Sequence, residues 1–562
     1  MIGILGVVHT VQVLATLLIP TLYADVIDHG VLVDDIGHVI SGGGLMLALT
    51  VLQVCCAAWA VRLSAGIAMN LGNQVRTDVF AQVQRFSGLD VARFGVASLL
   101  TRTTNDVQLI QMLVFTALAI SFPAPLIGIG GVALALGQSV SLSAVLAVEL
   151  PILVAVIGFV IGRMIPHATA TQRHVDRVNK VMREQIIGTR VIRAFVRTTH
   201  EQRRFADAVQ ELTAAGVRTG RLQVFFGATA ILISTLAAVV VIGIGGPRVA
   251  AGQLEPGTLI AVLSYLALAL NAVMVAMGVF IMLPAARASA VRIGEVLTTT
   301  PSIIDPVAPD PSPSGPGQLE LSGVSFGYPG AEEPAVRDVD LVARPGRLTA
   351  VVGSTGSGKT TLVKLIARLL DTEAGTLSID GTDVHRMRRS DLVRLVGLVP
   401  QQPFLFSGTV AFNLRYGNPD ATDDELWHSL EVAQARDFVE AMPGGLDAAV
   451  GQGGCSVSGG QRQRLAIARV LVAKPRIYLF DDAFSALDAA TEAALRQALT
   501  TEIGHATQVD VSQQVSTVHD ADHIIVLSSG RVEAAGTHQE LLAASSTYAE
   551  LVSSQLSSWQ LR

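Results

Sequence analysis

A glycine-rich segment near the middle of the chain has the composition of a phosphate-binding loop. Gly353-Ser354-Thr355-Gly356-Ser357-Gly358-Lys359-Thr360 follows a predicted strand at Leu348–Val352 and opens a helix that continues through Thr361. The glycines let backbone N–H groups converge on phosphate oxygens, and the helix N-terminus adds positive potential. We expect Lys359 to reach the β- and γ-phosphates of a bound nucleotide and Thr360 to ligate magnesium. The other residues of the loop and Thr361 are also expected to bind the nucleotide. The sequence therefore predicts an ATP and Mg²⁺ site.

Two further positions extend this predicted site. The apolar strand Ile477–Asp481 ends in a carboxylate, and we expect Asp481 to act on the magnesium side. Tyr328 stands shortly before the phosphate-loop strand, where it could stack on the adenine ring. An isolated aromatic residue more often belongs to the core, and the sequence leaves both interpretations of Tyr328 open.

The segment Val457-Ser458-Gly459-Gly460-Gln461-Arg462-Gln463-Arg464 resembles the signature sequence of ATP-binding cassette (ABC) proteins. With Gln401, Asp481 and Ser485–Asp488, the whole order of cassette motifs is present, and the resemblance to ABC exporter half-transporters covers nearly the entire chain. It implies that Gln401 is a nucleotide and metal ligand. It also implies that Ser458, Gly459, Gly460 and Gln461 present a helix start to the γ-phosphate of an ATP held by a second cassette.

The chain departs from the family pattern at two catalytic positions. The general base expected after Asp481 is a glutamate, but the residue is Asp482, which is one methylene shorter and loses about 1.3 Å of reach. A misplacement near 1 Å can cost about 100-fold in rate. The switch position, usually histidine, is Gln513, which can hydrogen-bond a phosphate but cannot become positively charged. These changes predict a site that retains ATP and hydrolyses it poorly.

The chain is too apolar for a soluble two-domain enzyme, and its composition is typical of a membrane protein with a soluble part attached. The chain has 562 residues, of which 50% are hydrophobic and only 15% charged, with a net charge of -6 and a mean hydropathy of +0.50. No basic tail or aromatic-plus-basic stripe indicates a nucleic-acid partner. A bilayer span needs about 20 apolar residues. Six stretches qualify, at roughly residues 3–23, 39–61, 109–137, 140–161, 222–246 and 257–283.

Charge and composition between the spans predict topology and domain limits. Arginines cluster between the second and third spans and between the fourth and fifth, which marks those segments, both termini and the ATPase domain as cytoplasmic. We interpret these two segments as helical stalks that leave the membrane. The alternative interpretation is that they are solvated cytoplasmic loops. A proline-rich linker at 301–317 separates a transmembrane domain at 1–300 from an ABC nucleotide-binding domain at 318–562. The expected fold is an α-helical six-span transmembrane domain followed by an α/β ABC-type P-loop ATPase domain.

The fourth span carries the one acidic residue inside the six apolar stretches. Glu149 could line a transport pathway and meet a cationic substrate or a proton, or it could be a protonated carboxyl bonded to a neighbouring helix. Exporters of this family usually begin with a basic amphipathic helix, whereas Met1 lies almost at the first span. We therefore expect either that the native chain starts upstream of Met1 or that this helix is absent.

The family resemblance and the two departures predict a bacterial inner-membrane ABC subunit paired with a different half-transporter. The substrate would be an amphipathic or lipid-like small molecule in the bilayer. Three alternatives remain open from the sequence: a homodimeric exporter with slow hydrolysis, an importer of the same architecture, and a receptor or channel gated by ATP without pumping.

Overall fold

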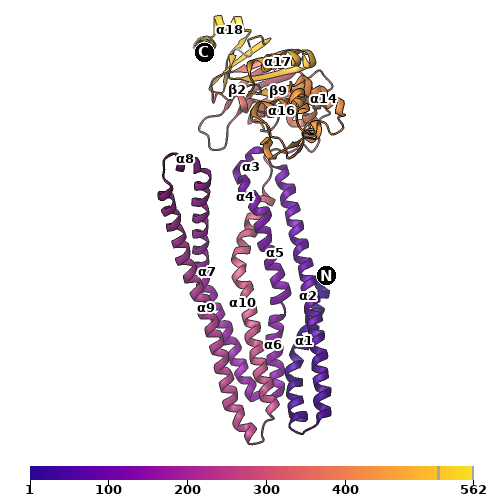
Figure 1. Ribbon diagram of the computed structural model, residues 1–562, viewed down its shortest axis with the longest axis vertical. Coiled ribbons are helices and arrows are strands. Elements are labelled where there is room, and N and C mark those ends of the chain that lie inside the picture. The colour runs from indigo at the N-terminus through magenta and orange to yellow at the C-terminus, as the bar shows by residue number, and fades with distance from the viewer. Residues whose placement is uncertain (516–518, 560–562) are drawn as a thin grey trace. The chain divides into compact units, whose positions relative to one another are not determined.

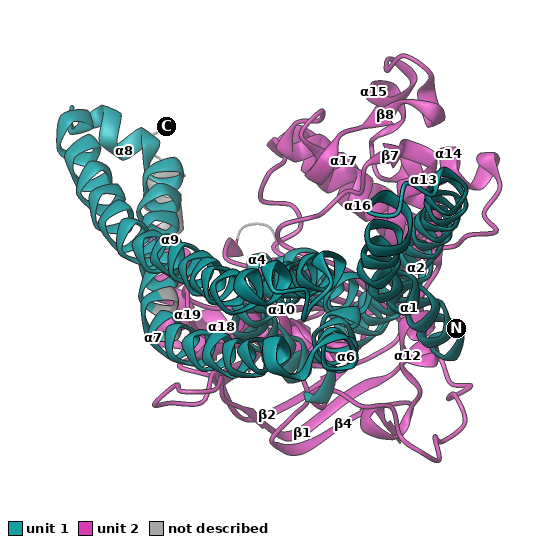
Figure 2. Cartoon of the chain, turned by 90° about the horizontal axis from the view of Figure 1, so that it is seen from below, with its two compact units in different colours: residues 1–84, 95–299 teal, residues 85–94, 300–562 magenta. Residues whose placement is uncertain are grey.

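The computed structural model describes residues 1–515 and 519–559 and divides the chain into two compact units. The first unit comprises Met1–Gln84 and Gly95–Thr299, and the second comprises Arg85–Phe94 and Thr300–Arg562 (Figure 2). The short segment Arg85–Phe94 thus belongs with the C-terminal part, although it lies within the N-terminal half of the sequence.

The first unit is built from long helices, six of which are long and apolar enough to cross a membrane (Figure 1). This confirms the predicted fold class for the N-terminal half. The helices and π-helical turns are α1 (Ile2–Val26), η1 (Ile27–Val31), α2 (Ile36–Arg85), α4 (Val96–Thr101), η2 (Arg102–Asp106), α5 (Val107–Thr116), η3 (Ala117–Ser121), α6 (Pro123–Gln138), α7 (Val140–Ile187), α8 (Thr189–Ala194), α9 (Thr198–Ala250) and α10 (Pro256–Thr298).

Several of these helices are much longer than a membrane is thick. Helix α2 has 50 residues, α7 has 48 and α9 has 53. At 1.5 Å per residue they are about 72–80 Å long, against about 30 Å of bilayer hydrocarbon. Each of the three is therefore much longer than one membrane span requires. Helices α7 and α9 run side by side and are joined at their tip by α8 (Figure 1).

Polar contacts between distant segments hold the helices of the first unit together. Tyr265 of α10 is fully buried, and its hydroxyl donates to the carbonyl of Leu17 over 2.8 Å. Towards the other end of α10, the buried carboxylate of Asp106 accepts from Nε of Arg292 over 2.8 Å and from the hydroxyl of Ser289 over 2.9 Å. These bonds fix α10 to the helices that precede it in the chain.

The second unit contains an α/β sheet and an antiparallel sheet, as the sequence predicts for an ATPase domain. The six-stranded sheet has the order β12-β11-β3-β10-β9-β6 and is parallel except for the β11–β12 pair, and a four-stranded antiparallel sheet has the order β2-β1-β4-β5. The strands are β1 (Leu319–Phe326), β2 (Val336–Ala343), β3 (Leu348–Val352), β4 (Ala374–Ile379), β5 (Thr382–Asp383), β6 (Val396–Val399), β7 (Gly408–Thr409), β8 (Ala449–Val450), β9 (Ile477–Asp481), β10 (Thr507–Ser512), β11 (His523–Ser528) and β12 (Arg531–Gly536).

Helices cover both sheets and add a smaller helical lobe. Strands β3, β9 and β10 are buried almost throughout, as expected for parallel strands covered on both faces. The helical elements are α3 (Gly88–Phe94), α11 (Lys359–Ile366), η4 (Val384–Arg386), α12 (Arg389–Leu395), α13 (Val410–Arg415), α14 (Asp423–Val432), α15 (Arg436–Glu440), η5 (Gly445–Asp447), η6 (Gln452–Gly454), α16 (Gly459–Ala473), α17 (Ala489–Ile503), α18 (His538–Ala544) and α19 (Ser546–Trp559).

The segment that carries α3 is tied to the start of the linker by one carboxylate. Oδ2 of Asp90 accepts from the backbone N–H of Ser87 over 2.9 Å and from the backbone N–H and hydroxyl of Ser302, both over 3.0 Å. Asp90 is only 7% exposed, and Leu89 packs against the core around the antiparallel sheet. The contact joins residues more than 200 positions apart.

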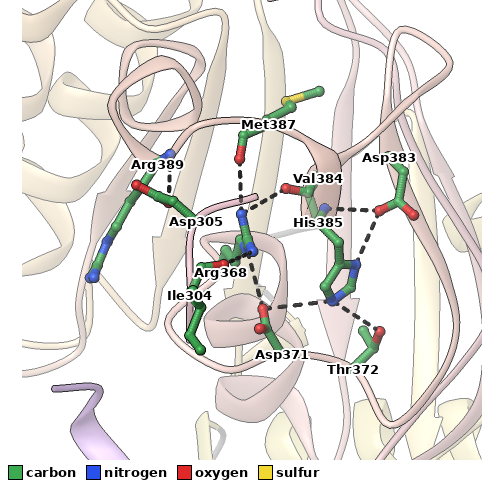
Figure 3. Close-up of polar contacts among 10 residues, drawn as sticks. All are labelled: Ile304, Asp305, Arg368, Asp371, Thr372, Asp383, Val384, His385, Met387 and Arg389. Carbon is green, nitrogen blue, oxygen red and sulfur yellow. Dashed lines mark hydrogen bonds and ion pairs between the residues drawn. The ribbon is translucent and has the colours of Figure 1, made fainter. Parts of the chain in front are cut away.

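The predicted linker is held to the ATPase domain by a buried arginine. The guanidinium of Arg368 donates to the carbonyl of Ile304 over 3.1 Å and to the carbonyls of Val384 and Met387 over 3.0 Å, while its Nε pairs with Asp371 (Figure 3). Arg368 is 3% exposed, so its charge is satisfied by these four acceptors rather than by water. The linker is therefore anchored at this point.

Candidate functional site

The phosphate loop connects β3 to α11 at the carboxyl edge of the parallel sheet. A Cβ on Gly358 would lie 2.3 Å from the carbonyl oxygen of Ala335, and a Cβ on Gly353 would lie 2.2 Å from that of Leu527. Gly358 also has φ of +103°, a conformation that glycine adopts without strain. Glycine is therefore required at both positions for the loop to wrap against its neighbours.

The lysine of the loop folds back onto the loop itself. Nζ of Lys359 donates to the carbonyls of Gly353 and Ser354, both over 2.7 Å. Burial lowers the pKa of Lys359, and the charges of Asp482 and Asp481 oppose that shift. The ammonium group therefore stands where phosphate oxygens could replace the two carbonyl partners.

The residues predicted on the metal side come together at the end of β9. The hydroxyl of Thr360 donates to Oδ1 of Asp481 over 3.0 Å. Burial raises the pKa of the Asp481 carboxyl, and the Thr360 hydrogen bond opposes that change. A hydroxyl and a carboxylate are hard oxygen ligands that fit Mg²⁺. Within the described residues no group of three His, Cys, Asp or Glu could hold a metal ion.

Gln401 and Asp482 are directly linked across the site. Nε2 of Gln401 donates to Oδ2 of Asp482 over 3.1 Å. The backbone of Asp482 has φ of +50°, and its N–H donates to the carbonyl of Val511 on β10 over 2.8 Å. The residue at the base position is thus held by its own backbone and by the glutamine side chain.

The register of the parallel sheet brings the switch position beside the phosphate loop. Ser512 pairs with Val352, the last residue of β3, and Val511 pairs with Asp481. Gln513 follows β10 directly and is exposed, just as Gly353, the first residue of the loop, directly follows β3. The base position and the switch position therefore lie at the carboxyl ends of two adjacent strands, where ligands bind in open α/β sheets.

Tyr328 lies next to the phosphate-loop helix. Its hydroxyl is 3.2 Å from the hydroxyl of Thr361, and its ring packs edge-on against Phe326 with centroids 5.1 Å apart. The ring is half-buried rather than enclosed. This position is compatible with both interpretations that the sequence left open.

The signature residues form the exposed start of α16. Ser458 caps the helix: its hydroxyl accepts from the N–H of Gln461 over 3.2 Å, and Oε1 of Gln461 accepts from the N–H of Ser458 over 2.9 Å. Ser458 and Gly459 are exposed, and a Cβ on Gly459 would meet nothing within 4 Å. Free N–H groups at a helix N-terminus are an anion-binding feature, here open to solvent.

The structure also contains a charged group that the sequence analysis did not single out. Asp510, in the middle of β10, pairs with Arg496 of α17, and it is 1% exposed. The available signal was an aspartate between two valines in a strand of the parallel sheet. Its arginine partner lies on another element, so the pair could not be recognised from spacing alone.

In the first unit, Glu149 is buried in α7 and is 3% exposed. The hydroxyl of Ser234 on α9 is its polar neighbour, but among the described residues neither carboxylate oxygen has a partner in hydrogen-bonding geometry. An ionisable side chain in this setting is costly and is by default a functional candidate.

Comparisons with known proteins agree with this arrangement. Residues 2–273 match the family model for the ABC transporter transmembrane region, and residues 336–485 match the model for the ABC transporter domain. An uncharacterized ABC transporter ATP-binding protein of Mycobacterium tuberculosis is 43% identical over 559 residues, covering 99% of this chain and 96% of that protein. An ATP-dependent lipid A-core flippase of Desulfotalea psychrophila is 31% identical over 484 residues, covering 85% of this chain and 84% of the flippase.

The fold is also that of a solved exporter. A bacterial Atm1-family ABC exporter with ATP bound matches with a TM-score of 0.85 at 22% identity, over 99% of this chain and 98% of that chain. This likeness concerns the fold of the helices and sheets.

Proposed function

The chain belongs to the ABC transporter family, and we propose that it is the ATP-retaining half of a two-subunit exporter. It is a multi-pass membrane protein with one set of six spans and one cassette. In the proposed assembly a second, different half-transporter supplies the other six spans and the other cassette.

The observation that carries the proposal is the contrast between binding and catalytic groups at one sheet edge. Lys359, Thr360 and Asp481 are all present, as nucleotide and magnesium binding require. Lys359 is held against the phosphate loop by the carbonyl of Gly353, and Thr360 donates to Asp481. Asp482 is short by one methylene, its oxygen is engaged by Gln401, and Gln513 replaces a group that could become charged. A cassette of this kind holds ATP between subunits while its own hydrolysis is slow.

The signature sequence gives this chain a second role in the proposed pair. The exposed start of α16 would complete the partner's site by presenting Ser458, Gly459, Gly460 and Gln461 to the γ-phosphate of ATP on the partner's phosphate loop. The partner would then carry the glutamate and histidine that this chain lacks. ATP turnover would occur mainly there.

The tip of α7, α8 and α9 supplies the expected mechanical contact. Ile187, Val191, Phe195 and Val196 are 61–84% exposed at this tip, which is an unusual cluster of apolar side chains for a segment outside the membrane. We assign it to the partner's cassette, so that closure of the two cassettes around ATP moves the helices. The same coupling in reverse would reset the transporter after hydrolysis.

The proposed substrate is an amphipathic or lipid-like small molecule, and the proposed location is the bacterial inner membrane with both termini and the ATPase domain in the cytoplasm. The apolar spans and the similarity to a lipid A-core flippase support this class. The arginine-rich segments between spans support the orientation.

The test is ATP turnover by this chain alone and with a partner. A half-transporter with glutamate and histidine at the two positions, encoded beside this one, should co-purify with it, and the pair should hydrolyse ATP faster than this chain alone by about 100-fold. Rapid hydrolysis by the isolated chain, abolished by Asp482→Asn, would instead establish a homodimer. That second candidate is favoured by one observation: Asp482 is still a carboxylate beside the metal-side residues.

A further inference from the structure

Helix α17 covers two cavities that meet at the same three residues. The larger has a volume of about 420 Å³ and the smaller about 20 Å³. Phe484, Arg496 and Asp510 contribute to the walls of both. The two spaces are therefore neighbours that share part of their walls.

The cavities extend towards opposite edges of the parallel sheet. Leu348 and Gln508, near the amino ends of β3 and β10, line the larger cavity. Asp482 and Gln514, beyond the carboxyl ends of β9 and β10, line the smaller one. The larger cavity therefore lies away from the carboxyl edge of the sheet, where the predicted ATP site lies. Strand β10, which forms part of its wall, runs from this cavity to that edge.

Asp510 stands at the point where the cavities meet and is incompletely satisfied. Its Oδ2 accepts from Nη1 of Arg496 over 2.9 Å. Nε of the same guanidinium donates to Glu492 over 2.9 Å, and its Cζ lies 4.1 Å from the centre of the Phe484 ring. Oδ1 of Asp510 is buried and has no hydrogen-bond partner among the described residues. Burial raises the pKa of Asp510, and the charge of Arg496 opposes that shift.

A buried carboxylate oxygen without a donor is costly, and a positive charge in the adjoining cavity would stabilise the ionised carboxylate of Asp510. The wall of the larger cavity favours a positively charged ligand, because it contains the three carboxylates of Asp510, Asp520 and Asp522 and one cationic side chain, that of Arg496. Phe480 and Leu499 add an apolar surface. The volume lies in the range of small-molecule sites, about 300–1,000 Å³.

We propose that the larger cavity under α17 is a binding site for a small organic cation with a flat apolar body. The cationic group of the ligand is attracted by the carboxylates of Asp510, Asp520 and Asp522, and its apolar part lies against Phe480 and Leu499. This site does not depend on whether the chain pairs with a different subunit or with itself. A ligand in this cavity would contact β10, the strand that ends just before Gln513.

Benzamidine and benzamide form a matched pair of probes, because they have nearly the same shape and differ in charge. Binding is measured by ligand-detected saturation-transfer NMR on the full chain in lipid nanodiscs. We expect saturable binding of benzamidine, at least 10-fold tighter than that of benzamide. Equal binding of the two probes would overturn the proposal.

Two neighbouring threonines on α17 provide a test that leaves the core unchanged. Thr500 is exposed and lines the larger cavity, whereas Thr501 is exposed and does not. Thr500→Trp should fill the cavity and weaken benzamidine binding at least 10-fold, while Thr501→Trp should leave it unchanged. Asp510→Asn should remove the preference for benzamidine over benzamide. Identical binding by the Thr500 and Thr501 variants would rule the site out, whether or not the Asp510 variant folds.

Discussion

The side chain of Gln401 donates to the carboxylate of Asp482 over 3.1 Å, which joins the residue at the base position to the loop after β6. The same carboxylate would have to orient a water for attack on the γ-phosphate. Asp482 also has its backbone fixed to β10. A side chain that is short, anchored and already hydrogen-bonded has little freedom to move towards a water.

Restoring the two catalytic groups should increase hydrolysis at this site. In the assembled transporter, with the partner's catalytic glutamate inactivated, Asp482→Glu together with Gln513→His should raise ATPase activity by about 10- to 100-fold. Phosphate release measures the effect. Asp482→Asn with Gln513 retained is the control and should stay at the basal rate; a double variant that also stays there would contradict the role assigned to these positions.

Lys359→Ala should remove nucleotide retention. Loss of a charged donor to phosphate is worth about 3 kcal/mol, which corresponds to about 100-fold in dissociation constant. Binding of a fluorescent ATP analogue to the full chain measures this loss. Lys474→Ala is the matched control, because Lys474 pairs with Glu425 on the surface; similar losses in both variants would indicate a general effect on folding.

Gly459→Asp should block turnover by the pair without affecting ATP binding to this chain. A side chain at Gly459 meets nothing within 4 Å in the isolated subunit, but a carboxylate at this helix start would repel the partner's γ-phosphate. We expect a loss of at least 10-fold in ATPase activity of the complex and unchanged nucleotide affinity of this chain alone. If turnover persists at the original rate, the signature does not act on the partner's ATP.

Asp90 should make the attachment of α3 dependent on pH. Burial alone would raise the pKa of Asp90, but hydrogen bonds from Ser302 and Ser87 outweigh it and hold the pKa below its usual value. Because the folded pKa is depressed, this stabilisation is present above the unfolded pKa of about 3.9 and is lost as pH falls through the folded value. Hydrogen exchange of residues 85–94 should therefore accelerate in that acidic range.

The same amides give a test at neutral pH. Asp90→Asn should accelerate their exchange by removing about 1.5–3 kcal/mol of charged hydrogen bonding. Asp78→Asn, at an exposed position of α2, should leave exchange unchanged. Unaltered exchange in the Asp90 variant would mean that the carboxylate does not hold this helix.

Replacing Glu149 should affect the stability of the protein and its transport activity in opposite directions. Glu149→Leu removes a buried carboxyl without partners among the described residues, so the free energy of unfolding should rise by about 2–3 kcal/mol. If the residue lines the pathway, drug- or lipid-stimulated ATPase activity of the pair should fall in the same variant. Thermal unfolding in nanodiscs gives the first measurement, with Glu149→Gln as the isosteric comparison; a less stable Leu variant would show that the carboxyl is structurally required.

The sequence alone predicted the features whose signals are local. Six apolar stretches correspond to six candidate membrane helices, because a span is defined by about 20 consecutive residues. The loop at residues 353–360, the carboxylate at the end of β9 and the helix start at Ser458 could also be recognised, since each depends on neighbours within a few positions. The substitutions at Asp482 and Gln513 were visible for the same reason.

Only the tertiary structure decided which distant residues meet. The grouping of Arg85–Phe94 with the ATPase domain depends on Asp90 and Ser302, and the anchoring of the linker depends on Arg368 and Ile304. The buried pair of Asp510 and Arg496 likewise joins a strand to a helix. A charged side chain becomes stable inside a protein only when folding brings a partner to it, and the identity of that partner is not encoded in the residues next to it.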